Sequence, residues 1–190
     1  MTNKIFIISG PSGCGKNTII EELVKIPDLN LFKSKSYTTR AERESDITEN
    51  KYIFVNEDEF KKKEISGEIL ESNFYNNCYY GTSKSEIEKA LVQGKNVIKD
   101  IDVNGGARYR EILPDAVLIF IYSQIENIKD RLVKRDQNTP EEIDERLKIA
   151  ENEIKAGKNY DYFIENPEGH PEIAVENIKN IILKELQNGN

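Results

Sequence analysis

Near its N-terminus the chain has a glycine-rich stretch whose residue types suit the phosphates of a nucleotide. It reads GPSGCGKNT, close to the phosphate-binding pattern G-x-x-x-x-G-K-[ST]. Its glycines allow backbone N–H groups to converge on an anion, and Lys16 adds a positive charge for the β and γ phosphates. We therefore predict a nucleoside triphosphate site made by Gly10, Pro11, Ser12, Gly13, Cys14, Gly15, Lys16, Asn17 and Thr18.

The pattern is broken at Asn17. A serine or threonine hydroxyl normally binds Mg²⁺ at that position. The amide oxygen of Asn17 is also a ligand for a hard cation, so it could bind Mg²⁺ directly or hold a metal-bound water. Thr18 is offset by one residue and should point in another direction on a helix. The stretch predicts phosphate binding but leaves the metal geometry open.

The residues on either side of this stretch predict the elements that a phosphate loop needs. Ile5–Ile8 is an apolar, mostly β-branched run typical of a buried parallel strand. After the glycines, apolar residues recur at helical spacing until Pro27 ends the helix. A strand, a glycine-rich loop and a helix follow one another, which is the context in which such a loop binds phosphate.

The rest of the chain divides into an insert and a segment in which strands and helices alternate again. Residues 31–80 contain short β-like pieces between polar connectors, which predicts mixed structure. From residue 83 onward strands and helices alternate, and two charged helices are joined by the polar turn DQNTP. This order predicts an α/β fold with a parallel core sheet. Four capping pairs mark helix starts: Asn56/Glu59, Ser83/Glu86, Ser123/Glu126 and Thr139/Glu142.

The composition excludes several classes of function. The 190 residues include 27 basic and 34 acidic ones, a net charge of −7, which disfavours binding to nucleic acid or an anionic membrane. Two cysteines and one histidine form neither a disulfide framework nor a zinc site. The apolar start is too short for a signal peptide, and no segment approaches membrane-spanning length. We expect a soluble, cytoplasmic protein.

The blocks along the chain resemble, in order, those of guanylate kinases. They are GPSGCGK, SYTTRAER, YIFV, EILE, YYGTS, DIDVNG and the pair Arg135 and Arg146, spread from residue 4 to about residue 166. The resemblance implies a P-loop NTPase core with a parallel sheet flanked by helices (1–34, 86–122 and 151–190). It also implies a mixed α/β GMP-binding insert (35–85) and a helical lid (123–150).

The resemblance implies that the γ-phosphoryl group of ATP passes to GMP or dGMP, giving ADP and GDP, with Mg²⁺ and in a monomer or homodimer. It assigns the acceptor phosphate to Arg40, Arg43, Tyr52 and Tyr80, and guanine to Glu71, Ser36 and Thr82. Asp100 and Asp102, expected on one face of a strand end, would lie between the nucleotides. The catalytic residues would be Lys16, Arg40, Arg135, Arg146 and Asp100, and Asp102 would contact GMP.

The chemistry of these residues agrees with the implied roles. Planar guanidinium groups suit bidentate contact with a phosphate. The carboxylate of Glu71 can accept from the adjacent N1–H and 2-amino groups of guanine, which adenine lacks.

Three positions raise questions. Asn104 stands where the family usually has glutamine. Lys99 stands where it usually has an apolar residue, so this lysine is either buried and paired with a carboxylate or the mark of an altered site. For Arg131 we expect partners on its own helix at i,i+4 spacing.

Two other functions fit the same fold. One is a related small-molecule kinase, such as a ribose bisphosphate kinase, because such relatives also carry a non-hydroxyl residue after Gly-Lys. The presence of Glu71 and YYGTS argues against it, since a sugar has no guanine edge. The other is a catalytically silent module that binds protein. Such modules typically lose the loop lysine and the lid arginines, which are present here.

Overall fold

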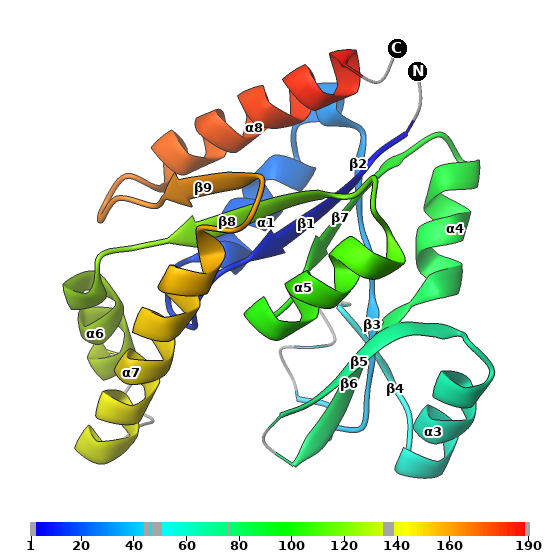
Figure 1. Cartoon of the computed structure of the whole chain (residues 1–190), viewed down its shortest axis with the longest axis horizontal. Coiled ribbons are helices and arrows are strands. Elements are labelled where there is room, and N and C mark those ends of the chain that lie inside the picture. The colour runs from blue at the N-terminus through cyan, green and yellow to red at the C-terminus, as the bar shows by residue number, and fades with distance from the viewer. Residues whose placement is uncertain (1–2, 44–45, 47–50, 76, 135–138, 189–190) are drawn as a thin grey trace.

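The computed structural model describes residues 3–43, 46, 51–75, 77–134 and 139–188. Its core is a five-stranded parallel sheet in the order β2-β7-β1-β8-β9 (Figure 1). The predicted α/β fold with a parallel core sheet is confirmed. The strands are β1 (Ile5–Ser9), β2 (Leu31–Lys33), β7 (Asn96–Asp100), β8 (Val117–Tyr122) and β9 (Tyr162–Glu165).

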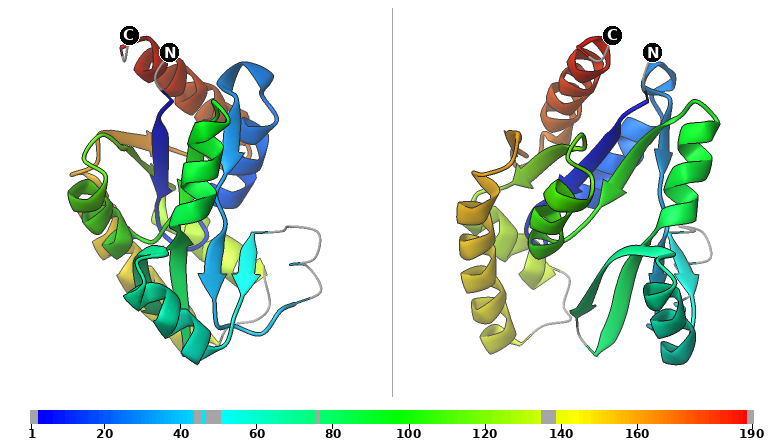
Figure 2. Two further views of the ribbon diagram at one scale, coloured as in Figure 1. Left: turned by 90° about the vertical axis from the view of Figure 1, so that its right-hand side faces the viewer. Right: turned by 45° about the vertical axis from the view of Figure 1, so that its right-hand side comes forward.

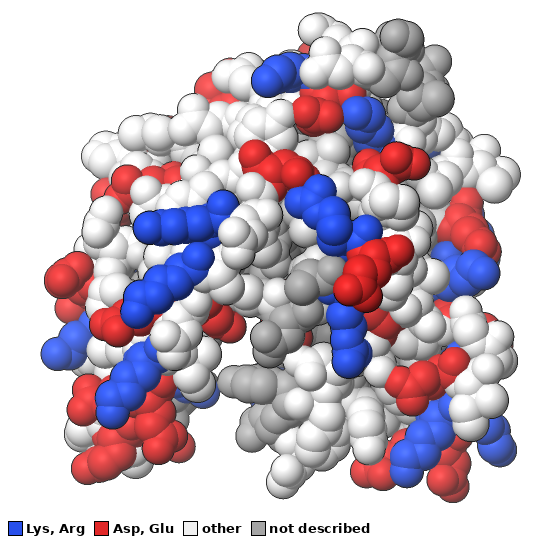
Figure 3. All heavy atoms as spheres, in the orientation of Figure 1, with Lys and Arg blue, Asp and Glu red and all other residues white. Residues whose placement is uncertain are grey.

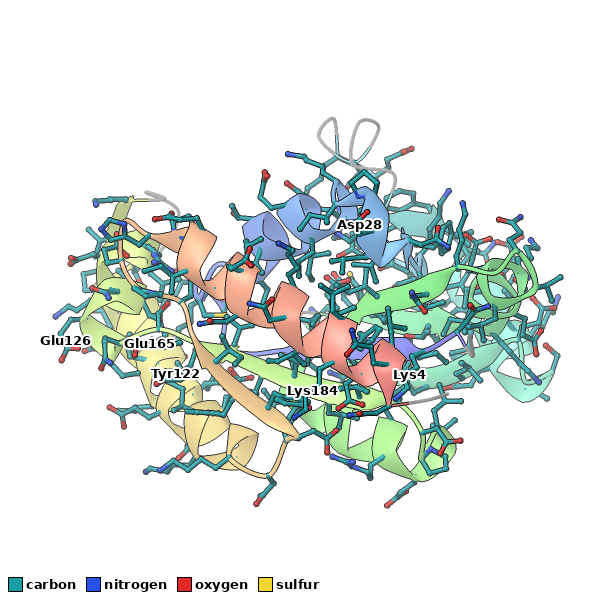
Figure 4. All side chains as sticks on the ribbon, turned by 90° about the horizontal axis from the view of Figure 1, so that it is seen from above. Lys4, Asp28, Tyr122, Glu126, Glu165 and Lys184 are labelled. Carbon is teal, nitrogen blue, oxygen red and sulfur yellow. The ribbon has the colours of Figure 1, made fainter. Side chains whose placement is uncertain are left out.

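Helices cover both faces of this sheet, which explains why its central strands are continuously apolar. On β1, Phe6 and Ile8 pack into the cluster under α1 (Lys16–Val24) and α8 (Pro171–Gln187). Ile7 points to the opposite face, where α5 (Val103–Ile112) contributes buried Tyr109. Viewed from above, α8 runs across the sheet, and Lys4 lies near its C-terminal end (Figure 4).

A second, smaller sheet has the order β4-β3-β6-β5 and contains antiparallel pairs. It packs with α3 through a small core of Tyr37, Phe60 and Ile69. Figure 2 shows this sheet and α3 set apart from α8 and from both described chain ends. Its elements are β3 (Ser36–Thr38), β4 (Tyr52–Phe54), α3 (Glu57–Ile65), β5 (Ile69–Tyr75) and β6 (Cys78–Ser83), and α4 (Lys84–Val92) follows.

A helical pair, α6 (Ile125–Lys134) and α7 (Pro140–Gly157), has its own apolar cluster that includes Ile128 and Leu132. The pair lies across from the second sheet, beyond the carboxyl ends of the core strands (Figure 1). The space-filling view shows the surface notched between these two parts, with basic and acidic side chains interspersed around it (Figure 3). Within the described ranges, no helix is both long and apolar enough to cross a membrane.

Three of the four predicted helix caps are confirmed. Reciprocal capping boxes form at α3 and α7, and the Ser83 side chain accepts from the backbone N–H of Glu86. The predicted cap at Ser123 is wrong, because α6 begins at Ile125 and Ser123 lies two residues before it; the Ser123 hydroxyl donates to the backbone carbonyl of Asn166 at 2.8 Å. The Ser123 hydroxyl, which the local pattern assigned to a helix start, therefore bonds a residue that is distant in the sequence.

Candidate active site

The phosphate loop lies between the carboxyl end of β1 and the first turn of α1, as predicted. Gly13 and Gly15 have φ angles of 86° and 94°, a left-handed conformation that favours glycine. Gly15 is the N-cap, so the first N–H groups of α1 point out of the helix without intrahelical acceptors. The Lys16 ammonium donates to the carbonyls of Gly10 at 2.5 Å and Pro11 at 3.1 Å. The loop thus presents backbone donors and a positive charge at one place.

Cys14 supports the loop from inside. Its side chain is buried, and burial raises the pKa of its thiol. Its carbonyl accepts from the Asn166 amide Nδ2 at 2.7 Å, which ties the loop to the end of β9. Cys14 therefore contributes its backbone to the site, while Ser12, Asn17 and Thr18 are exposed to solvent.

A cavity of about 330 Å³ adjoins the loop. Sequence reasoning missed the part of its lining that comes from the turn after β9, including Asn166 and two prolines. The only signal there was a polar residue just beyond a predicted parallel strand, where ligand sites are common. The lining residues are Gly13, Gly15, Thr18, Arg131, Lys134, Asn166, Pro167 and Pro171.

Arg131 reaches from α6 to this loop. Its Nη1 donates to the carbonyl of Gly13 at 3.1 Å, and its Nε and Nη2 donate to Glu168 Oε2 at 3.1 and 2.5 Å. The expectation of partners on its own helix is wrong. The side chain contacts the phosphate loop and Glu168, neither of which is part of α6, and it lines the cavity beside the loop.

Across the notch, Arg40, Tyr52 and Tyr80 lie together as predicted. The Arg40 guanidinium lies 5.2 Å from the centre of the Tyr52 ring, and the Tyr52 and Tyr80 rings meet edge to face at 6.1 Å. Burial and the nearby Asp100 charge raise the pKa of Tyr52. The Arg43 side chain is exposed. These residues make an aromatic-lined cationic site close to the end of β7.

Asp46 is a residue of this region that sequence reasoning missed. Its carboxylate accepts from Arg40 and from the backbone N–H of Arg43, the latter at 2.7 Å. The Arg40 hydrogen bonds hold the pKa of Asp46 below its ordinary value. An aspartate three residues after a surface arginine gives no sequence signal of its own, because such spacing is common on solvated turns.

Glu71, Thr82 and Ser36 come together in the second sheet. Ser36 pairs with Thr82 across β3 and β6, and the Thr82 hydroxyl donates to Glu71 Oε1 at 2.9 Å. Burial raises the pKa of the Glu71 carboxyl, against the lowering effects of Thr82 and Lys99. A carboxylate with one oxygen already bonded is left with acceptor capacity for a ligand.

Asp100 is the last residue of β7. Burial by itself would raise the pKa of its carboxyl. Nearby positive charges outweigh burial and lower the pKa below its ordinary value, so the group stays ionised; the lysines responsible are Lys99, Lys33 and Lys16. Asp100 is therefore an anion held among cations.

Asp102 does not share the strand face expected for it. The strand ends at Asp100, and Asp102 is the N-cap of α5, accepting from the Gly105 backbone N–H at 2.8 Å. Asn73 of β5 donates to its other oxygen at 2.5 Å. The helix starts at Val103 because Asp102 caps it, and this cap places its carboxylate beside the second sheet.

Lys99 is buried and lies beside a carboxylate, the first of the two alternatives. Its Nζ lies 3.7 Å from Asp100 Oδ1 and donates to Ser36 Oγ at 2.5 Å. Lys33 is a second cation near Asp100, and its Nζ is buried without a hydrogen-bond partner among the described residues. Lys99 and Lys33, which the sequence alone did not place in the site, thus both lie near Asp100.

Arg146 lies on α7, in the helical pair, and is half-buried. On the same helix, burial raises the pKa of Glu153, and the positive charge of Lys16 opposes that shift. Arg135 and the side chain of Asn104 lie outside the described residues. Within the described ranges, no three histidine, cysteine, aspartate or glutamate residues gather into a group that could hold a metal ion.

A protein-family model described as guanylate kinase matches residues 2–185. The chain belongs to the guanylate kinase family. The guanylate kinase of Clostridium perfringens strain SM101 is 40% identical over 183 residues, which cover 95% of this chain and 83% of that protein. The guanylate kinase of Malacoplasma penetrans strain HF-2 is 39% identical over 186 residues, or 96% and 94% of the two chains.

The fold agrees with that of a solved guanylate kinase. The crystal structure of the enzyme from Anaplasma phagocytophilum matches this chain with a TM-score of 0.76 and 30% identity, covering 97% of this chain and 86% of that one. The family membership predicted from the ordered sequence blocks is confirmed, and so is the fold class.

Proposed function

We propose that this protein transfers the γ-phosphoryl group of ATP to GMP, giving ADP and GDP. The observation that carries the proposal is a half-buried carboxylate, Glu71, beside two hydroxyl groups in the same small sheet as the Arg40 and Tyr52 site. The second sheet therefore offers hydrogen-bonding groups for a nucleotide base and a positively charged group for its phosphate. The phosphate loop offers a separate anion site, so two nucleotides can face each other across the notch.

In this proposal ATP occupies the phosphate loop and the adjoining cavity. The N–H groups at the start of α1 and the Lys16 ammonium bind the β and γ phosphates. To reach the phosphates, Lys16 exchanges the carbonyl oxygens of Gly10 and Pro11 for phosphate oxygens. The flat Arg131 guanidinium and the ring of Pro167 provide surfaces for the adenine base in the cavity.

GMP occupies the second sheet. Arg40, Arg43, Tyr52 and Tyr80 bind its phosphate, while Glu71 accepts from N1–H and the 2-amino group of guanine. Ser36, Thr82 and Asp102 complete the contacts to the base. An adenine base would leave the half-buried Glu71 carboxylate without its donors, and sites of this kind can discriminate by about 10⁴-fold.

The residues near the loop fit Mg²⁺. Asn17 is exposed at the start of α1, and Asp100 stays ionised at the end of β7, so each offers a hard oxygen ligand. Mg²⁺ commonly takes one or two protein oxygens and fills its shell with phosphates and waters. When bound, the ion would neutralise charge on the phosphates. Asn17 and Asp100 are the residues that would hold it, directly or through water.

The protein's own residues do most of the remaining work by position and charge. Phosphoryl transfer needs little covalent help from the protein. Lys16, Arg135 and Arg146 stabilise the charge on the phosphoryl group, and Arg40 holds the acceptor phosphate in line with it. Movement of α6 and α7 toward the second sheet would exclude water and limit hydrolysis of ATP.

These roles divide the chain as the sequence blocks suggested. Residues 1–34, 86–122 and 151–190 form the core that binds ATP, residues 35–85 bind GMP, and residues 123–150 act as a lid. We place the reaction in the cytoplasm, where both nucleotides are available. The enzyme acts as a monomer or a homodimer, which light scattering on the purified protein distinguishes.

An ADP-release assay tests the proposal. The protein is given ATP and Mg²⁺ with GMP, dGMP, AMP, UMP or a ribose bisphosphate precursor, each separately. We expect turnover with GMP and dGMP and very little with the others. A Lys16→Met variant serves as the control for contaminating kinases. Folded protein that does not turn over GMP would refute the proposal, and turnover with the sugar phosphate would favour the related small-molecule kinase.

A further inference from the structure

Lys99 is a cation in the hydrophobic interior. Its neighbours on β7, Val97 and Ile98, are fully buried, and Lys99 itself is only 3% exposed. Burying an ammonium group is costly unless the group is paired and hydrogen-bonded. The donation to Ser36 Oγ at 2.5 Å and the Asp100 carboxylate at 3.7 Å provide both. Lys99 thereby joins the core sheet to the first residue of β3.

This contact fixes how the Ser36 hydroxyl can act toward a ligand. An ammonium group has three donors and no acceptor, so Ser36 Oγ accepts from Lys99. Among the described residues, Lys99 is the only hydrogen-bond partner of that hydroxyl. The O–H of Ser36 is left to donate. A ligand that offered a second donor instead would leave this buried O–H without an acceptor, which is unfavourable.

The donor of Ser36 lies beside an acceptor. Ser36 is paired with Thr82 across the sheet, and Thr82 in turn bonds Glu71. A donor next to a carboxylate complements a purine edge with an acceptor on C6 and donors on N1 and C2. An amino group on C6 would place a donor against the O–H of Ser36. A hydroxyl donor and a carboxylate placed in this way would contact different atoms of one base.

We propose that Lys99 is a specificity-determining positioning residue, which holds Ser36 as a donor and so selects a 6-oxo purine over a 6-amino purine. The inference rests on the proposed function, because it places the acceptor base beside Ser36 and Glu71. Glu71 recognises N1–H and the 2-amino group. Lys99 acts through Ser36 on the atom attached to C6.

The test compares two acceptors that share the 2-amino group, GMP and 2-aminoadenosine monophosphate, the second of which has an amino group on C6. The readout is the ratio of kcat/KM for the two, with ATP saturating. Lys99→Met should lower the preference for GMP by about tenfold, the effect of roughly one hydrogen bond. Ser36→Ala should do the same, and adding Lys99→Met to Ser36→Ala should change the ratio no further.

Lys33→Met is the matched control. Lys33 also has a buried ammonium group near Asp100, but this group makes no hydrogen bond to Ser36. Its loss should alter the charge around Asp100 and leave the GMP preference at the wild-type ratio. A fall in the ratio equal to that of Lys99→Met would overturn the inference, because the effect would then come from charge and not from Ser36.

A purely structural role for Lys99 gives a different result. It would raise KM or lower kcat for both acceptors alike and leave the ratio unchanged, which overturns the inference. If Lys99→Met fails to fold by circular dichroism, Ser36→Ala decides, since a wild-type ratio in that variant also overturns it. Wild-type protein that does not use GMP would refute the proposed function and this inference with it. Wild-type preference for GMP with unchanged ratios in both variants would refute the inference alone.

Discussion

Arg40 and Asp46 form a bidentate ion pair, with Arg40 Nη1 2.9 Å from Asp46 Oδ2 and Nη2 2.8 Å from Oδ1. Nη1 also donates to the carbonyl of Ala41 at 2.7 Å. These contacts use the end of the guanidinium group. They leave the edge formed by Nε and the second hydrogen of Nη2 for another planar or tetrahedral anion. Asp46 therefore fixes the orientation of Arg40 without occupying all of its donors.

Replacing Asp46 by asparagine should weaken GMP binding. Without the carboxylate, Arg40 loses its fixed orientation, so KM for GMP should rise about fivefold to tenfold while KM for ATP stays unchanged. Initial rates over a range of GMP concentrations measure this. Asp58→Asn, an exposed aspartate on α3, is the matched control. A lower KM for GMP would contradict the prediction and would mean that Asp46 competes with the phosphate.

Replacing Glu71 by glutamine should impair recognition of guanine. The amide would present a donor where guanine needs an acceptor, so kcat/KM for GMP should fall on the order of 100-fold. KM for ATP should not change, because Glu71 lies in the second sheet. Glu68→Gln, an exposed glutamate paired with Lys63, is the control. Equal losses for GMP and ATP would show that the assigned role is wrong.

Replacing Arg131 by methionine should weaken ATP binding. The change removes the hydrogen bond to Gly13 and one wall of the cavity, so KM for ATP should rise about tenfold. KM for GMP should change little. Arg110→Met, which breaks an exposed ion pair with Asp161, controls for the loss of an arginine. An unchanged KM for ATP would show that Arg131 has only a structural role and does not contribute to ATP binding.

Replacing Asn17 by serine should tighten the dependence on Mg²⁺. A hydroxyl is the usual ligand at this position of the loop, so half-maximal activity should need several-fold less Mg²⁺. The measurement is activity against free Mg²⁺ at fixed ATP. Asn17→Ala, which removes the amide, should shift the curve the opposite way. A fall in activity for Asn17→Ser would instead identify the asparagine as an adapted ligand.

Replacing Glu185 by glutamine should destabilise the protein in a pH-dependent way. Its carboxylate accepts from Tyr162 Oη at 2.7 Å and Lys4 Nζ at 3.0 Å, so the free energy of unfolding should fall by about 1–2 kcal/mol at pH 7. The Tyr162 hydrogen bond, with a smaller contribution from Lys4, lowers the pKa of Glu185 below its ordinary value. The stabilisation is therefore present above the unfolded pKa and lost as pH falls through the folded one.

The hydrogen bond between Tyr162 and Glu185 also makes the free energy of unfolding depend on pH in the alkaline range. The Glu185 hydrogen bond raises the pKa of Tyr162 from 10.0 to about 12, so this part of the stabilisation is full below pH 10 and is lost as pH rises toward 12. Urea unfolding of both proteins from acid to alkaline pH measures the difference. Glu176→Gln, which breaks an exposed pair with Lys179, should show little change. A difference that does not vary with pH would contradict the assignment.

Local sequence signals predicted much of this molecule. The strand, glycine loop and helix around Lys16 follow from apolar periodicity and glycine conformation, both of which act over a few residues. The acceptor residues were predicted only because several blocks occurred in a familiar order. Neither argument needs contacts between distant residues.

The contacts that could not be predicted from the sequence join residues that are far apart along the chain. Arg131 and Gly13 are 118 residues apart, and Lys99 and Ser36 are 63 apart. The same is true of Ser123, whose hydroxyl donates to the carbonyl of Asn166 and does not cap the helix that follows it. A polar side chain with several possible partners takes the one that the tertiary fold brings close, and local spacing does not contain that information.

The hydrogen bond between Asn166 and Cys14 spans 152 residues. A chain synthesised from its N-terminus produces the phosphate loop well before the side chain that braces it. The hydrogen bond from Asn166 can form only after β9 has paired with β8, so the loop depends for this contact on a residue made much later.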